Sequence, residues 1–164
     1  SFSKIIGPGT RMGYVTAPDD MLDKIRIVKS GGGVNQFAAI AIHRYANSKL
    51  NEDIINRNSI LKSKRDAMLK ALNQYFDFDN GAKWSIPEGG LYIWLELNSK
   101  YDLVELLPIA QQHSLSYQPG TMFDPNSTIG KNCARLCFGY NEPKRIDKGI
   151  QLLSELIIKN YPSQ

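Results

Sequence analysis

The stretch LYIWLEL, residues 91–97, is the clearest fold signal in the chain. Its Leu and Ile side chains alternate along one face of an extended strand, whereas Tyr92, Trp94 and Glu96 share the other face. Because both faces carry large side chains, we expect both to be largely covered. The stretch therefore predicts a strand in a sheet that packs against helices.

A second strand is predicted at residues 133–139 (CARLCFG), where apolar residues again alternate with others. Arg135 lies on the less apolar face, where a charge is costly unless an anion lies nearby. An arginine at such a place is suited to binding a carboxylate through two hydrogen bonds, and an ordinary salt bridge is the alternative. Cys133 and Cys137 share a face but lie too far apart for a comfortable bridge, which predicts reduced thiols.

Helices are predicted before and after these strands along the chain. From about residue 55 onward we expect an α+β layer structure, with the sheet on one side and helices on the other. A long helix with a seven-residue apolar repeat is expected at Ile54 to Tyr75, and a helix capped by Asp102 is expected at 103–110. A short strand is expected at Leu115 to Gln118, and a final amphipathic helix from Pro143 to before Pro162.

The first third of the chain predicts a loop, a short strand at Met12 to Val15, and a helix for which Asp19 and Asp20 provide the N-cap. Three glycines at 31–33 end that helix. Asn35 is a suitable cap for the next helix, and Asn47-Ser48 separates it from the long helix.

Composition excludes several classes of protein. With 164 residues, 42% of them hydrophobic, the chain can bury a substantial core. The net charge of +4 is spread along the chain, and the densest basic run, Lys62 to Arg65, is interpreted as a solvated helix face, so no nucleic-acid partner is expected. No apolar stretch reaches the roughly 18 residues that span a bilayer, and no signal peptide is recognised. The His and Cys residues show no metal-ligand spacing, so no metal site is expected.

The opening segment carries the clearest chemistry. Lys4 is flanked by Ser1 and Ser3 in a glycine-rich loop, and Arg11 follows seven residues later. An amine nucleophile beside hydroxyl and guanidinium donors suits a carbonyl cofactor that bears a phosphate. An exposed lysine in a turn is the alternative. The pattern S-x-x-K also fits penicillin-binding proteins and β-lactamases, but their S-D-N and K-T-G strings do not occur here.

Three segments together resemble one family. They are SFSKIIGPGTRMGY (1–14), PEGGLYIWLEL (87–97) and ARLCFGYNEPKRIDKGIQLL (134–153). They resemble the lysine segment, the small-domain entry strand, and the carboxylate-binding arginine with the last helix of class I/II, fold-type I aminotransferases. The glycines at 31–33 before an Asn-x-Phe helix look closest to the 2-aminoadipate and kynurenine aminotransferase type.

The resemblance implies a role for each candidate residue. Lys4 would be the Schiff-base lysine of pyridoxal 5'-phosphate and would later carry a proton. Ser1, Ser3 and Arg11 would surround the cofactor phosphate, and Arg135 would bind the α-carboxylate of the amino acid. Residues 1–50 would be the end of the large cofactor-binding domain, and residues 51–164 the small C-terminal domain with its connecting long helix.

The resemblance also implies what a longer parent protein would do. It would be a cytoplasmic homodimer that transfers an amino group from an amino acid to a 2-oxo acid. The chain starts without methionine and resembles the segment after the family's aspartate, which pairs with the ring nitrogen, so we expect a fragment that is inactive alone. The alternative parent is a GntR/MocR-type transcription regulator with an aminotransferase-like effector-sensing domain.

Overall fold

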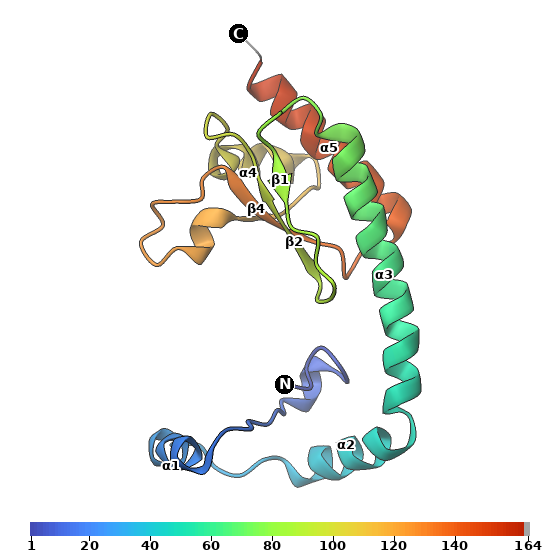
Figure 1. The fold of residues 1–164 in the computed structure, drawn as a ribbon, viewed down its shortest axis with the longest axis vertical. Helices are drawn as coiled ribbons and strands as arrows, with labels where there is room; N and C mark the ends of the chain where they lie inside the picture. The colour runs from blue at the N-terminus through green and yellow to red at the C-terminus, as the bar shows by residue number, and fades with distance from the viewer. Residues whose placement is uncertain (163–164) are drawn as a thin grey trace. The chain divides into compact units, whose positions relative to one another are not determined.

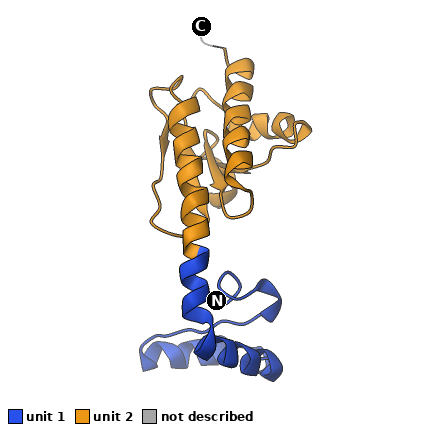
Figure 2. Ribbon diagram, turned by 90° about the vertical axis from the view of Figure 1, so that its right-hand side faces the viewer, with its two compact units in different colours: residues 1–57 blue, residues 58–164 orange. Residues whose placement is uncertain are grey.

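The computed structural model describes residues 1–162, which fall into two compact units, Ser1–Arg57 and Asn58–Gln164 (Figure 2). The division lies within the long helix α3 (Leu50–Tyr75). The domain boundary expected at residues 50/51 concerns a longer polypeptide and stays a prediction. None of the helices in residues 1–162 has the length and apolar character needed to cross a bilayer.

The first unit is helical. It contains the single turn η1 (Pro8–Thr10), helices α1 (Asp19–Val28) and α2 (Gln36–Ser48), and the start of α3. The Asn35 side chain accepts a hydrogen bond of 3.1 Å from the Ala38 N–H, which confirms Asn35 as the N-cap of α2. Ile42 is the single buried side chain among the described residues of this unit.

Two predictions for the first unit are wrong. Residues 12–15 form no strand, because a single backbone hydrogen bond from Phe2 to Met12 does not make a ladder, and Tyr14 and Val15 are exposed. Asp19 and Asp20 are the first residues of α1 instead of its cap, which is Pro18. Carboxylates are favourable in a first turn because they face the positive end of the helix dipole.

The second unit is built on a four-stranded antiparallel sheet. Its strands are β1 (Lys83–Trp84), β2 (Tyr92–Glu96), β3 (Gln118–Pro119) and β4 (Cys133–Cys137), in the order β1-β2-β4-β3. The predicted strands at 91–97 and 133–139 are confirmed as β2 and β4. The strand expected at 115–118 is wrong in position, because pairing with β4 begins only at Gln118.

Three helices cover one face of this sheet: the second half of α3, α4 (Leu103–Gln112) and α5 (Pro143–Asn160) (Figure 1). The inward residues of β2 and β4 join a cluster of buried side chains from all three helices. Members from the sheet are Ile93, Leu95, Ala134 and Leu136, and those from the helices include Met68, Ala71, Leu72, Leu103, Leu106, Ile150, Leu153 and Ile157. The expected α+β arrangement, with helices on one side of the sheet, is confirmed.

The beginning of α4 is fixed by polar contacts. The Asp102 carboxylate accepts hydrogen bonds from the backbone N–H groups of Val104, at 2.9 Å, and Glu105, at 3.1 Å, which confirms the predicted cap. The buried Tyr117 hydroxyl donates to the Leu103 carbonyl at 2.7 Å. The Tyr117 bond joins the first turn of α4 to the segment that leads into β3.

Among the described residues of the second unit, no α-helix covers the other face of the sheet, so the expectation that both faces are largely covered is met only in part. Tyr92 and Trp94 are half-buried and Glu96 is exposed. The short turn η2 (Gly120–Phe123) reaches this face, where Phe123 packs edge-to-face on Trp94 with ring centroids 5.4 Å apart. Below, we call this side the open face of the sheet.

The long helix α3 also differs from its prediction. A seven-residue repeat predicts one buried stripe along the whole helix, but its buried residues all lie in the second half. Ile54 and Leu61 are half-buried, whereas Met68 is buried. The core of the second unit covers only the part of α3 that belongs to it.

Candidate active-site residues

The predicted lysine loop folds back on itself. The Phe2 N–H donates to the Met12 carbonyl at 2.9 Å, and a Cβ built on Gly13 would lie 3.1 Å from the Ser1 Cα. Position 2 therefore faces position 12, and position 1 faces position 13. Glycine at 13 permits this close approach, because a side chain there would be tighter than an ordinary contact.

Lys4 lies on the turn that joins these two segments. The Phe2 carbonyl accepts backbone hydrogen bonds from the N–H groups that follow, the shortest from Ile6 at 2.8 Å. The Arg57 guanidinium donates to the Ile5 carbonyl and so holds the turn to the start of α3. Lys4 is exposed, and no ion pair within residues 1–162 includes it. Its amine is therefore accessible to an electrophile.

Hydroxyl and guanidinium donors lie on the same loop. The Ser1 Oγ and Ser3 Oγ atoms are 3.1 Å apart, and the Ser3 N–H donates to Ser1 Oγ at 3.3 Å. Arg11 adopts a left-handed backbone conformation, with φ 47°, and its guanidinium donates to the Pro8 carbonyl at 3.3 Å. The structure thus brings Ser1, Ser3, Lys4 and Arg11 onto one folded loop, where an amine stands with hydroxyl and guanidinium groups that suit a phosphate.

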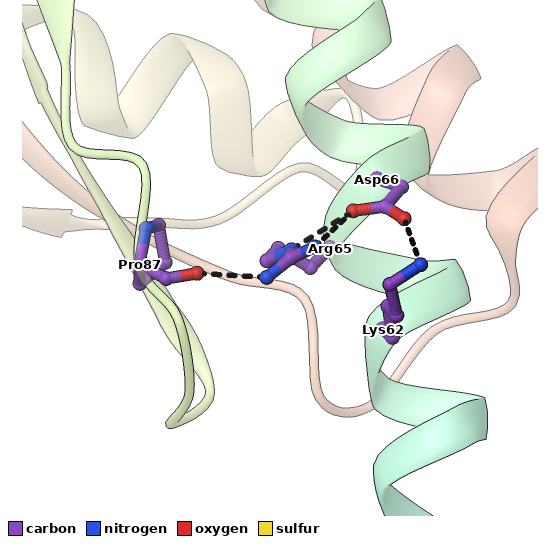
Figure 3. A network of polar contacts seen from close by, with 4 residues as sticks. All are labelled: Lys62, Arg65, Asp66 and Pro87. Atoms are coloured by element: carbon purple, nitrogen blue, oxygen red, sulfur yellow. Dashed lines mark hydrogen bonds and ion pairs between the residues drawn. The ribbon is translucent and has the colours of Figure 1, made fainter.

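The glycine loop before β2 is held by α3 (Figure 3). Arg65 Nη1 donates to the Pro87 carbonyl at 3.0 Å, and its Nε and Nη2 donate to the Asp66 carboxylate at 2.9 and 2.6 Å. The bonds from Arg65 lower the pKa of Asp66. Gly90 has φ 81°, a left-handed backbone conformation that favours glycine at this position of the loop. A cavity of about 310 Å³ lies between α3, Gly89–Gly90 and Phe138.

Lys64, the residue next to Arg65, is a feature that sequence reasoning missed. Interpreting residues 62–65 as a solvated face is wrong at Lys64, whose side chain is 9% exposed and donates to Glu142 Oε1 at 3.1 Å and the Tyr140 carbonyl at 3.4 Å. The signal was present in the spacing, because Lys64 falls between Leu61 and Met68 on the buried side of the helix. Lys64 therefore joins α3 to the segment that follows β4.

Arg135 projects from β4 onto the open face. Trp94 on β2 and Gln118 on β3 are its direct partners in the sheet register. Its Cζ atom lies 4.0 Å from the centroid of the Tyr92 ring. No carboxylate in residues 1–162 forms an ion pair with Arg135, so the salt-bridge alternative finds no partner in the described chain. Its charge is therefore available to a bound anion.

Comparison with known proteins identifies the family. Residues 1–152 match the model for aminotransferase class I and II. The chain belongs to the class I and II aminotransferase family. This membership confirms the resemblance inferred from the three segments.

Several relatives of the chain are aminotransferases. The aromatic-amino-acid aminotransferase 1 of Thermococcus litoralis is 34% identical over 160 residues, which cover 96% of this chain and 38% of that protein. The 2-aminoadipate transaminase of Thermus thermophilus is 24% identical over 159 residues, which cover 96% of this chain and 39% of that protein.

A solved structure agrees with this family at the level of the fold. The kynurenine aminotransferase of Pyrococcus horikoshii, determined in complex with PMP, superposes with a TM-score of 0.89 at 32% identity. The match covers 99% of this chain and 40% of the other. The chain therefore has the fold of part of a fold-type I aminotransferase, and it spans about two fifths of the length of these aminotransferases.

The chain is also similar to proteins that are named as transcriptional regulators. An uncharacterized HTH-type transcriptional regulator of Bacillus subtilis is 25% identical over 160 residues, which cover 94% of this chain and 32% of that protein. The regulator that the sequence left as an alternative parent is therefore represented among the relatives.

Proposed function

We propose that this chain is the portion of a pyridoxal-phosphate-dependent aminotransferase that carries its Schiff-base lysine, Lys4, and its carboxylate-binding arginine, Arg135. The parent would transfer an amino group from an amino acid to a 2-oxo acid. The observation that carries the proposal is the folded loop that holds Lys4 with Ser1, Ser3 and Arg11, in a chain of the aminotransferase family. We expect the fragment alone to be inactive.

The loop fits the cofactor by its donors. Pyridoxal 5'-phosphate has an aldehyde, which requires an amine, and a phosphate, which requires several hydrogen-bond donors. The Ser1 and Ser3 hydroxyls lie 3.1 Å apart on one segment of the loop, and Arg11 lies on the facing segment. When bound, the cofactor supplies an electron sink that stabilises negative charge at the α-carbon of the substrate.

The remaining chemistry belongs to side chains of this chain. In the proposal, Lys4 would hold the cofactor through its Nζ atom and would move the proton of the substrate α-carbon, as a general base and acid. Ser1, Ser3 and Arg11 donate to the phosphate, which fixes the cofactor in register with Lys4. Arg135 binds the α-carboxylate through two parallel N–H donors, and this orients the amino acid.

The proposal includes a cytoplasmic homodimer as the working form. Its support is the exposed apolar surface of α2, where Phe37 is 88% and Ile40 is 53% exposed. Side chains of this size are usually covered in a working protein when they lie close together. A further segment of the parent or a second subunit would cover them.

The first test is the visible absorption spectrum after incubation with pyridoxal phosphate. In the longer polypeptide that contains this chain, we expect an absorption band from the lysine-bound cofactor, and we expect the band to be lost in Lys4→Ala. Lys24→Ala, which removes an exposed lysine from α1 of the same unit, is the matched control and keeps the band. The isolated chain should show no such band.

Each result of this test has a definite meaning. A parent without the band contradicts the aminotransferase proposal. A band that survives Lys4→Ala assigns the cofactor to another lysine. A normal band in the isolated chain shows that residues 1–164 contain more of the cofactor site than we propose.

A second candidate function rests on the similarity to HTH-type regulators. In that case, the parent would sense an effector through the same cofactor lysine and would bind DNA through a separate domain. Residues before Ser1 in the parent distinguish the two functions, because a winged-helix region far upstream indicates the regulator. Gel-shift binding of the parent to DNA, together with absent transaminase activity, would favour this candidate.

A further inference from the structure

The Arg135 guanidinium lies against two aromatic rings from different elements. Its Cζ atom is 4.0 Å from the centroid of the Tyr92 ring and 4.9 Å from the centroid of the Phe123 ring. Tyr92 is the first residue of β2, and Phe123 is the last residue of η2, which follows β3 directly. Because β2 and β3 are the two neighbours of β4, the rings reach Arg135 from two separate parts of the fold.

This arrangement restricts how a ligand can approach. A guanidinium is planar, its N–H donors point outward in that plane, and its weakly hydrated faces stack favourably on aromatic rings. No side-chain hydrogen bond or ion pair within residues 1–162 uses the donors of Arg135. The two rings, at 4.0 and 4.9 Å from Cζ, limit the orientations open to the guanidinium. Its unused donors remain for a planar acceptor, and a carboxylate matches them with two parallel bonds.

The rings are themselves supported. Phe123 packs on Trp94 with an interplanar angle of 79°, and Trp94 lies directly opposite Arg135 in the register of β2 and β4. Phe123 therefore contacts both members of this cross-strand pair. Aromatic side chains have few rotatable bonds, so little entropy is lost in holding them in one place. The orientation of Arg135 can thus be set before a ligand binds.

We propose that Tyr92 and Phe123 are positioning residues that hold the Arg135 guanidinium in the orientation that receives a carboxylate. The inference rests on the proposed function, since it assumes that Arg135 is the carboxylate-binding group. Removing one ring frees the guanidinium, and ordering it again on binding costs about 0.5 to 1.5 kcal/mol, which corresponds to a loss of about two-fold to twelve-fold in carboxylate affinity.

The test follows the Arg135 side chain by NMR in the complete 164-residue chain with ¹⁵N-labelled arginine. The Nε–Hε resonance of Arg135 is identified by its loss in Arg135→Lys, and sodium acetate is the carboxylate probe, with sodium chloride at equal ionic strength as reference. We expect Tyr92→Leu to move this resonance away from its ring-shifted position and to weaken acetate binding about two-fold to twelve-fold. Tyr92→Phe, which keeps the ring, should bind acetate as the wild type does.

Two further variants separate positioning from a general loss of structure. Phe123→Leu changes a side chain that is 47% exposed, so the fold tolerates it, and it should weaken acetate binding in the same direction as Tyr92→Leu. Tyr140→Leu removes a ring that is 86% exposed and makes no contact with the Arg135 guanidinium, so acetate affinity should not change. Thermal unfolding is recorded for every variant, because a purely structural defect lowers the melting temperature without a selective change at Arg135.

The outcomes distinguish the inference from the proposed function. If acetate binds Tyr92→Leu and Phe123→Leu as tightly as the wild type, the positioning role is overturned and the carboxylate role of Arg135 stands. If the wild-type Arg135 resonance does not respond to acetate, the carboxylate role fails and the positioning role fails with it. If Tyr92→Leu does not fold, the affinity of Phe123→Leu decides between these results.

Discussion

The two units of this chain differ in where their apolar side chains lie. In the second unit, three helices and the inward face of the sheet share one continuous cluster of buried side chains. In the described part of the first unit, Ile42 alone is buried, whereas Ile27 and Phe37 are 84% and 88% exposed. The second unit therefore contains the core that stabilises it, and the loop that carries Lys4 belongs to a unit that has almost none.

This difference shows that the formation of a helix and the burial of its apolar side are separate properties. The helices of both units have apolar residues at helical spacing, and both sets of helices form. Only in the second unit does the described chain supply the surface that covers them. Amphipathic spacing thus predicts that a helix forms, but it does not say which surface buries the apolar side of that helix.

The largest expected difference between the units is the loss of stability when an apolar side chain is replaced by alanine. Leu95 is fully buried on β2, so Leu95→Ala should lower the free energy of unfolding by about 3 to 5 kcal/mol through lost burial and a residual cavity. Ile27→Ala, at a side chain that is 84% exposed in α1, should change it by less than about 0.5 kcal/mol. Urea denaturation followed by circular dichroism measures both, and equal effects would contradict the assignment of the core to the second unit.

Much of the second unit could be predicted from sequence because its signals are local. Strict alternation identified β2 and β4, and Asp102 identified the start of α4. The predicted strand near Leu115 began too early, and a buried lysine, Lys64, was taken for a surface charge. Both errors concern residues whose surroundings are set by distant segments: β3 exists only where β4 pairs with it, and Lys64 is buried by the segment around Glu142.

The sequence was enough to propose which residues belong to the candidate site, but not how these residues lie in the fold. Residue types and order alone selected Lys4, Arg11 and Arg135. The pairing that brings positions 1 and 13 together depends on backbone angles, and the rings beside Arg135 come from β2 and η2, which are far apart in sequence. Tyr92 was read only as one of the residues of a covered strand face, because alternation says which face a residue shares but not which side chain it contacts.

A smaller difference between the units is expected in how their tyrosines affect stability at alkaline pH. Burial raises the pKa of Tyr117, and the nearby Tyr161 and Asp102 add to this effect. Since the folded state holds this proton more tightly than the unfolded state, the stabilisation is complete below the unfolded pKa of about 10 and is lost as pH rises above it, by up to about 1.4 kcal/mol per pH unit. Tyr117→Phe should therefore flatten the alkaline part of the stability curve.

The same substitution should also cost about 1 kcal/mol at neutral pH, because it removes the hydrogen bond from the Tyr117 hydroxyl to the Leu103 carbonyl. Tyr14→Phe, in the first unit, changes a side chain that is 73% exposed and should leave the whole curve unaltered. Urea denaturation from pH 7 to pH 11 compares the two variants. An alkaline slope that is as steep in Tyr117→Phe as in the wild type would assign the titration to other tyrosines.

The smallest expected contrast lies between two helix caps of similar geometry, Asp102 on α4 and Asn35 on α2. Replacing either by alanine removes a capping acceptor worth about 1 kcal/mol to its helix. Asp102→Ala should lower the global unfolding free energy by that amount, because Leu103 and Leu106 of α4 belong to the core. Asn35→Ala should instead speed amide hydrogen exchange in residues 36–48 and leave the unfolding of the second unit unchanged.

Asp102 further permits a test of whether charge or capping matters. Its burial acts to raise the pKa, but hydrogen bonds from the Glu105 and Val104 N–H groups and the contact with Lys131 outweigh this and lower it. The resulting stabilisation is present above the unfolded pKa of about 4 and is lost as pH falls below it. Asp102→Asn keeps a capping acceptor and should retain most of the stability at pH 7 while losing this acid dependence. If Asp102→Ala and Asn35→Ala instead lowered one common transition equally, the two units would unfold as a single cooperative structure, and the contrast between a unit with a core and a unit without one would not govern stability.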